Sequence, residues 1–331
     1  MTKMGSIAGD SPRKVDIRNI DDGPGGPYCM SFNFDPGPLA DAIRRAGLIN
    51  SPVLKENGQD KFDVVAGYRR IHAMKLLGWN KIPCRIVSGL PPLKCLLLNL
   101  YDNLSVRTFN DVEKAMILNR LLTWVSKEEL FKVYMPLLGL PSHEPVLKYY
   151  LRIESEPDED IRKAIADGVV CTRAARMLLE MDGHVKSRLC DLIQSLKFNT
   201  NYQIQLIELL IDISHKEKRS IPDIIDSPGL KDIIASDRMN NPQKINAILG
   251  TLRSRRFPRL VQAEERFKQM VCRLDLPEGV SIRRPPFFEA PGYRMEVFFE
   301  NGKELERKIE HLLHEKNLAT LRDPWEKIPH A

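Results

Sequence analysis

Apolar residues near the start of the chain recur at helical spacing and then at strand spacing. Leu39 and Ala40 lie four and three positions before Ile43, and Gly47 follows. This pattern predicts a short amphipathic helix that ends at a glycine. The segment 52–54 that follows is apolar and predicts a strand.

A second strand-to-helix alternation follows directly. Asn57-Gly58 is typical of a hairpin turn, and Phe62–Ala66 predicts the strand after it. Beyond Gly67, apolar residues recur at three-residue steps until Gly78, which predicts a helix, and residues 82–87 predict another strand. Helices and strands alternating over so short a stretch indicate a compact α/β domain.

The rest of the chain divides into a helical middle and a mixed end. Residues 92–248 have mostly helical periodicity, whereas strands are predicted at 279–283 and 293–299 and a charged helix at 302–316. The predicted fold class is a multidomain α+β protein. Its expected parts are a small α/β domain over residues 15–110, an all-α domain over 111–250 and a small α/β or dimerisation domain over 251–331.

Composition narrows the class of protein without naming a function. Hydrophobic residues make up 43% and charged residues 28%, as in ordinary folded proteins. No apolar run is long enough to cross a bilayer and the start lacks the pattern of a secretory signal, so we expect a cytoplasmic protein. The six cysteines have no paired spacing, which disfavours a zinc site or a disulfide framework.

The charge is unevenly distributed. The net charge is +6. Residues 1–110 contain 15 basic and 10 acidic side chains, whereas residues 111–250 contain 19 and 21. A dense cluster of basic residues begins the last part of the chain. It has two interpretations: a contact for DNA or for an acidic partner, or a solvated linker. Its members are Arg253, Arg255, Arg256 and Arg259.

The junction between the strand 62–66 and the next helix contains candidate chemistry. A helix N-terminus offers free backbone N–H groups and the positive end of the helix dipole, and both attract phosphate. Gly67 permits a positive φ, and Arg69 and Arg70 follow on the first turn. The alternative is that these arginines are solvated and Gly67 is a simple turn.

The surrounding pattern favours the phosphate interpretation. The segments 39–54, 64–73 and 82–87 resemble, in order and spacing, the N-terminal domain of the ParB family of chromosome and plasmid partition proteins, which has the ParB/sulfiredoxin-like fold. That family has a Gly-Glu-Arg-Arg motif here, which binds the triphosphate of CTP with magnesium. The present chain has Tyr68 in place of the Glu. Tyr68 also replaces the reactive cysteine of sulfiredoxins, which excludes thiol chemistry there.

A second family motif, Glu-Asn-x-Gln-Arg at the start of a later helix, resembles the segment from Asp102 to Arg107. Asp102 stands for the Glu, and one extra residue separates Asn103 from Arg107. The resemblance implies that Asp102 and Asn103 bind Mg²⁺ through the nucleotide, and their oxygen atoms suit that ion. The alternative is a helix N-cap.

The middle segment resembles the helix-turn-helix of ParB proteins. A helix opening at Ser126, a turn at Gly139-Leu140-Pro141 and a second helix over residues 142–153 make up the pattern. The first helix is longer than is usual in the family, and Pro136 is expected to break or kink it. The candidate DNA contacts of the second helix are Ser142, His143, Lys148 and Arg152. A helical bundle with solvated charges is the alternative, because this region has a net negative charge.

Together the resemblance implies a dimeric, nucleoid-associated protein that binds CTP or another nucleotide with Mg²⁺ and acts on DNA in partition or transcriptional regulation. Slow CTP hydrolysis and a ParA-like ATPase partner belong to the same expectation. The competing hypothesis is a nucleotide-dependent enzyme on this fold, a kinase or nucleotide hydrolase, that does not bind DNA.

Overall fold

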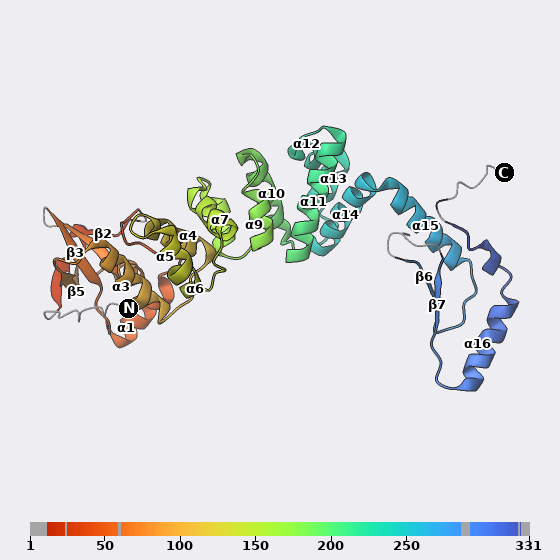
Figure 1. Cartoon of the computed structure of the whole chain (residues 1–331), viewed down its shortest axis with the longest axis horizontal. Coiled ribbons are helices and arrows are strands. Elements are labelled where there is room, and N and C mark those ends of the chain that lie inside the picture. The colour runs from red at the N-terminus through yellow and green to blue at the C-terminus, as the bar shows by residue number, and fades with distance from the viewer. Residues whose placement is uncertain (1–11, 24, 59–60, 286–291, 324, 326–331) are drawn as a thin grey trace. The chain divides into compact units, whose positions relative to one another are not determined.

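The chain forms two compact units, Met1–Ile204 and Gln205–Ala331. The structure is a computed structural model that describes residues 12–23, 25–58, 61–285, 292–323 and 325. Figure 1 shows strands at both ends of the chain and helices between them, which confirms the predicted α+β class. The boundary between the units lies inside helix α11 (Thr200–Glu217), and the division into three domains remains a prediction.

A five-stranded sheet organises the start of the first unit. Its strand order is β1-β5-β3-β4-β2, and β3 pairs antiparallel with β4 and parallel with β5. Val64 and Val65 are neighbours in β4 and both are fully buried, so both faces of this strand are covered. The strands are β1 (Arg13–Asp16), β2 (Ile20–Asp21), β3 (Val53–Gly58), β4 (Lys61–Ala66) and β5 (Lys81–Val87).

The two edge strands are consecutive in the sequence. Only the single 3-10 turn η1 (Ile17–Asn19) separates β1 from β2, yet they occupy opposite edges of the sheet. Three residues span roughly 10 Å when extended, so the sheet curls until its edges approach each other. This curvature comes from the tertiary structure, and no residue pattern predicts it.

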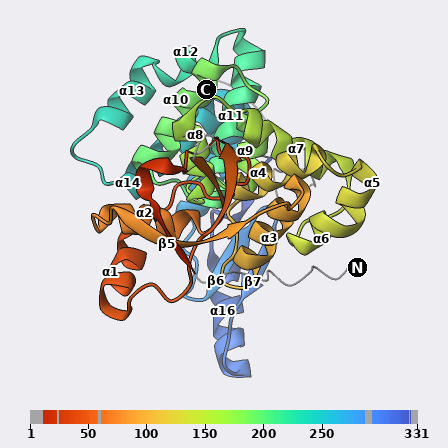
Figure 2. The same ribbon diagram turned by 90° about the vertical axis from the view of Figure 1, so that its left-hand side faces the viewer.

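Three helices accompany the sheet, as Figure 2 shows. They are α1 (Gly37–Ala46), α2 (Tyr68–Leu76) and α3 (Pro92–Leu104). The first two confirm the predicted helices, and α1 ends at Gly47 with φ +76°. Helices α1 and α2 pack against each other, and α3 packs against β4. The start of α2 therefore lies between the sheet and two other helices.

Helices make up the rest of the first unit. They are α4 (Asp111–Leu122), α5 (Lys127–Glu129), η2 (Leu130–Tyr134), α6 (Met135–Leu137), α7 (Glu144–Ser155), α8 (Glu159–Ala166), α9 (Thr172–Leu178) and α10 (Gly183–Leu196). The segments α5, η2 and α6 follow one another without a gap, and η2 is a π-helix. Pro136 was expected to break or kink this helix. The helix widens into a π turn just before this proline and ends one residue after it, at Leu137, in keeping with the expectation.

The second unit continues with helices α12 (Ile221–Ile225), α13 (Pro228–Ala235), α14 (Asn241–Arg256) and α15 (Pro258–Cys272). The predicted strands are confirmed as the antiparallel pair β6 (Val280–Arg283) and β7 (Arg294–Val297), followed by α16 (Gly302–His314) and the turn η4 (Leu318–Thr320). Among the described residues, no helix is both long and apolar enough to cross a membrane.

Candidate anion-binding site at the start of helix α2

The turn between β4 and α2 depends on a glycine. Gly67 precedes α2 with φ +99° and ψ 24°, in the left-handed region. A Cβ atom there would lie 3.1 Å from Cα of Pro52 and 3.2 Å from Nε of Arg70. No described side chain caps the first N–H groups of α2. These N–H groups are therefore available to a bound anion.

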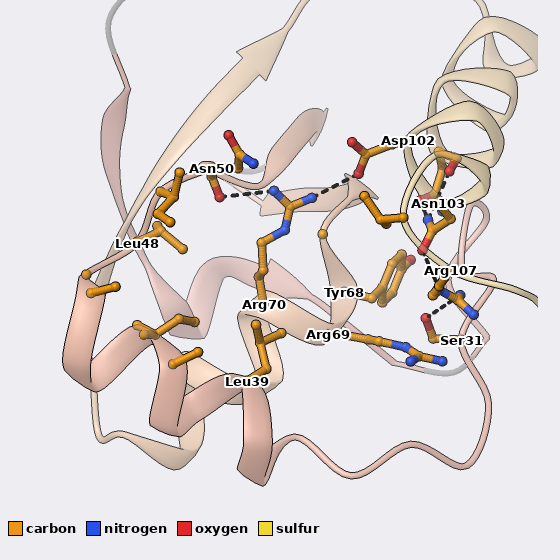
Figure 3. Close-up of a pocket in the computed structure, with 18 residues that line it drawn as sticks. Ser31, Leu39, Leu48, Asn50, Tyr68, Arg69, Arg70, Asp102, Asn103 and Arg107 are labelled. Atoms are coloured by element: carbon orange, nitrogen blue, oxygen red, sulfur yellow. Dashed lines mark hydrogen bonds and ion pairs between the residues drawn. The ribbon is translucent and has the colours of Figure 1, made fainter.

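A cavity of about 370 Å³ adjoins this turn. Its lining is apolar along α1 and at Leu48 and Ile49, and polar where α2 faces α3 (Figure 3). Gly67, Tyr68, Arg69 and Arg70 all line it. The structure therefore places the four predicted junction residues around one hollow.

Arg70 is held at the cavity by two partners. Its Nη1 donates to the carbonyl oxygen of Asn50 at 3.0 Å, and its Nη2 lies 2.9 Å from Oδ2 of Asp102. The side chain of Asp102 is 47% exposed, so its ion pair with Arg70 is open to exchange with an incoming anion. Arg70 is already oriented for such a partner.

Arg69 is held differently. Its Nη2 lies 2.8 Å from Oε1 of Glu113, whose side chain is only 1% exposed. Its guanidinium group lies over the ring of Phe34, with 5.1 Å to the ring centroid. Its Nε is buried and has no hydrogen-bond partner among the described residues. Arg69 is thus part of the packed structure and still has one donor unused.

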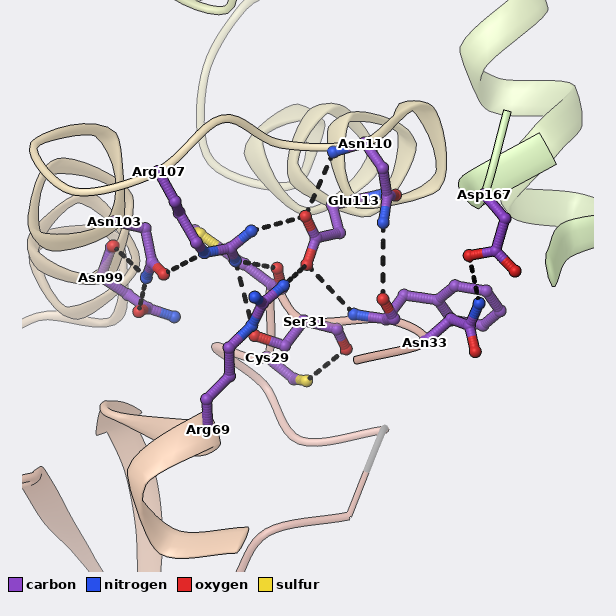
Figure 4. A network of polar contacts seen from close by, with 12 residues as sticks. Cys29, Ser31, Asn33, Arg69, Asn99, Asn103, Arg107, Asn110, Glu113 and Asp167 are labelled. Carbon is purple, nitrogen blue, oxygen red and sulfur yellow. Dashed lines mark hydrogen bonds and ion pairs between the residues drawn. The ribbon is translucent and has the colours of Figure 1, made fainter. Parts of the chain in front are cut away.

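Glu113 is the centre of a network that the sequence interpretation did not include (Figure 4). Its carboxylate pairs with Arg69 and, at 2.6 Å, with Nη1 of Arg107. It also accepts from the backbone N–H groups of Phe32 and Asn110, the latter as part of a capping box that starts α4. The spacing Asn110-x-x-Glu113 was a usable signal for that box. The contacts to two arginines were not foreseeable from it.

The two residues predicted for magnesium, Asp102 and Asn103, lie elsewhere on a helix than expected. Asp102 and Asn103 occupy the last turn of α3, not the start of a later helix, which corrects both the motif's placement and the N-cap alternative. Asn103 donates to Asn99 and accepts from Nε of Arg107 at 2.7 Å. Of the pair, only Asp102 keeps an exposed oxygen-bearing group at the cavity. No cluster of three metal-binding side chains occurs among the described residues.

Tyr68 is a core residue rather than an exposed ligand. It is 3% exposed, and its hydroxyl group has no hydrogen-bond partner among the described residues. Burial raises the pKa of Tyr68 well above its ordinary value. The hydroxyl therefore remains protonated at neutral pH.

The N-terminal part of the chain matches a known protein family. The family model for the ParB N-terminal domain matches residues 3–104. This part of the chain is similar to that domain family. Its match ends at the last residue of α3, so it contains the glycine turn, both arginines and the Asp102-Asn103 pair.

Individual relatives are similar over a longer stretch than the family model covers. Nucleoid occlusion proteins of Bacillus thuringiensis (strain Al Hakam) and Bacillus cereus (strain B4264) are each 29% identical over 145 residues. The alignment covers 43% of this chain and 47% of each relative, so the chain spans about half the length of these relatives.

Two solved structures of C-terminally truncated ParB from Caulobacter crescentus were also matched. One, complexed with CTP-gamma-S, is 19% identical with a TM-score of 0.26, and covers 56% of this chain and 99% of that chain. The other, complexed to the centromeric parS site, is 16% identical with a TM-score of 0.32, and covers 59% and 98%.

The residues predicted to contact DNA lie after the segment that the family model matches. The helix expected over residues 142–153 is α7, which begins at Glu144, so Ser142 and His143 lie in the preceding turn. Lys148 is exposed, and Arg152 pairs with Glu180. Tyr149 and Tyr150 are buried and belong to the core. Two of the four predicted residues thus lie in the turn before α7 and two are exposed on the helix itself.

Proposed function

We propose that the cavity beside α2 binds a nucleoside triphosphate, with its phosphates at the N-terminus of the helix. The carrying observation is that Gly67 opens an uncapped helix end onto a cavity lined by two arginines. Arginines in a first turn face the positive end of the helix dipole, so a phosphate there would add to the two carboxylates that already pair with them. The unused Nε donor of Arg69 favours the same ligand.

The second part of the proposal concerns the nucleotide and its metal. CTP is the first candidate, because the ParB resemblance of the junction implies it. Asp102 fits a magnesium ion shared with phosphates, since it is half-exposed, lines the cavity and ends a helix, where the dipole favours a cation. Magnesium would neutralise phosphate charge there. Asn103 fits less well, because its side chain is already engaged by Asn99 and Arg107.

Isothermal titration of the full chain with CTP, ATP and GTP, each with Mg²⁺, tests the site. We expect one nucleotide to bind and Arg70→Ala to weaken it at least tenfold, or about 1.4 kcal/mol. Arg85→Ala is the matched control, because Arg85 is exposed on β5 and outside the cavity lining; it should change affinity less than twofold. Equal affinity in both variants, or no binding by any nucleotide, would remove the proposal.

The third part is DNA binding in partition or a related regulatory process, through α7 and the turn before it. Lys148 is exposed on this helix, and each basic side chain that meets a phosphate adds about one unit to the salt dependence of binding. A genome-wide pull-down, with and without nucleotide, should enrich discrete sites. On an enriched duplex, Lys148→Ala should lower the salt slope by about one, whereas Lys94→Ala on α3 should not. Phosphate release without retention of any DNA would favour the enzyme hypothesis instead.

A further inference from the structure

The ion pair between Arg70 and Asp102 joins two helix ends of opposite polarity. Arg70 lies in the first turn of α2, and Asp102 lies in the last turn of α3. The helix dipole favours an anion at the start of a helix and a cation at its end. Each of the two charges therefore lies at a helix end that disfavours it, and their contact of 2.9 Å compensates for both.

Asp102 is the member of this pair that can leave. Its side chain is 47% exposed, whereas that of Arg70 is 20% exposed. Nη1 of Arg70 also donates to the carbonyl oxygen of Asn50 at 3.0 Å, and this bond keeps the guanidinium group in place without Asp102. Because ion pairs at exposed sites contribute little to stability, an exchange of partners at Nη2 of Arg70 costs little free energy.

Asp102 also opposes a phosphate in this cavity by its charge. Among the described residues that line the cavity it alone carries a negative charge, whereas Arg69, Arg70 and Arg107 carry positive charges. Glu113 pairs with Arg69 and Arg107 as well, but its side chain is 1% exposed and does not line the cavity. Glu113 is thus a fixed counter-ion of the packed structure, and Asp102 is an exchangeable one.

We propose that Asp102 is an autoinhibitory counter-ion of the nucleotide site. In the ligand-free chain it occupies Nη2 of Arg70, a donor that a phosphate would use, and it gives up this donor when it binds a divalent cation. Cation and polyphosphate therefore bind with positive coupling, because each replaces the partner that the other removes. This inference rests on the proposed function and adds the regulation of the same site.

Titration calorimetry of the full chain with inorganic tripolyphosphate, in EDTA and in excess Mg²⁺, measures this coupling. Tripolyphosphate probes the phosphate part of the site without a base. For the unchanged chain, Mg²⁺ should raise the affinity about tenfold. Asp102→Asn keeps the shape of the side chain and removes its charge, so the affinity in EDTA should rise about fivefold. In this variant Mg²⁺ should add less than about a further twofold.

Three further variants separate the release of Arg70 from a general change in charge. Asp41→Asn removes a carboxylate that pairs with Arg44 on α1, outside the cavity lining, and should change the affinity less than about twofold. In the Arg70→Ala background, Asp102→Asn should no longer raise the affinity in EDTA. Asp102→Glu keeps the negative charge, so it should bind weakly in EDTA and depend on Mg²⁺, as the unchanged chain does.

Three results overturn this inference and leave the nucleotide site intact. In the first, Asp102→Asn binds tripolyphosphate in EDTA no better than the unchanged chain, as a residue that only binds the cation would. In the second, the gain persists in the Arg70→Ala background, which indicates charge repulsion alone. In the third, the unchanged chain binds equally well in EDTA and in Mg²⁺, a result that needs no variant. If the unchanged chain binds neither tripolyphosphate nor any nucleotide with Mg²⁺, the proposed function fails together with this inference.

Discussion

Arginines gather in two regions of this protein and behave differently. In the first unit, Arg69 and Arg70 occupy the first turn of α2, beside a cavity. In the second, Arg253, Arg255 and Arg256 occupy the last turn of α14. The latter pair with Glu264, Glu217 and Asp212 respectively. Both sets are ion-paired, so pairing alone does not separate a binding site from a structural cluster.

The helix end makes the difference. Cations at a helix C-terminus are stabilised by the dipole and need no further partner, whereas cations at an N-terminus are opposed by it. The α14 arginines are ion-paired within the second unit, and the choice between a contact for DNA or an acidic partner and a solvated linker stays open for this cluster. The α2 arginines differ from these. They follow a left-handed glycine and line a cavity, and Nε of Arg69 has no hydrogen-bond partner among the described residues.

The largest expected effect compares two carboxylates that each pair with two arginines. Glu113 pairs with Arg69 and Arg107 and is 1% exposed; Glu264 pairs with Arg253 and Arg284 and is 16% exposed. Glu113→Gln should lower the free energy of unfolding by about 3 kcal/mol, because it leaves buried charge uncompensated. Glu264→Gln should cost about 1 kcal/mol or less. Urea denaturation followed by circular dichroism measures both, and equal losses would contradict the distinction.

A smaller effect is expected from adding one methyl group at the α2 turn. Gly67→Ala should weaken nucleotide binding about tenfold, because the new Cβ would crowd Pro52 and Arg70. Gly168→Ala is the matched control: Gly168 also has a positive φ, of +69°, but a Cβ there meets nothing within 4 Å. Both variants should lose about 1 kcal/mol of stability from backbone strain. Titration calorimetry should separate them, and an unchanged affinity for Gly67→Ala would count against the turn as the phosphate site.

The smallest effect belongs to the α14 cluster. A hydrogen bond from Arg255 lowers the pKa of Glu217 below its ordinary value of 4.5. A carboxylate with a depressed folded-state pKa stabilises the fold above its unfolded value, and this contribution is lost as the pH falls through the folded-state pKa. Arg255→Ala should therefore cost at most about 1 kcal/mol at pH 7, since the pair is partly exposed.

That cost should shrink as the pH drops below about 4.5 and disappear in stronger acid. Urea denaturation at pH 7, 5, 4 and 3 gives the profile. Nucleotide affinity should be unaffected by Arg255→Ala at pH 7. A loss of nucleotide affinity at pH 7 would show that the α14 arginines also contribute to nucleotide binding, and would contradict the distinction between the two regions.

Local sequence determined the elements and the junction. The glycine stop of α1, the β4–α2 turn with its two arginines and the β6–β7 pair all follow from patterns within a few residues, because periodicity and glycine conformation are local properties. Local reasoning was wrong about Asp102 and Asn103, which end a helix rather than begin one. The expected effect of Pro136 is seen, because the helix widens into a π turn just before the proline and ends one residue after it.

Tertiary structure alone decided which partner each charge received. Glu113 lies 44 residues after Arg69, and no spacing rule connects them. They meet because the fold brings the start of α4 next to the start of α2. The same holds for Asp22, placed beneath α2 beside Lys75 and His72. Sequence patterns reflect the periodicity of helices and strands, which is a local property. The depth of a cavity and the burial of a carboxylate depend instead on contacts between segments far apart in the chain.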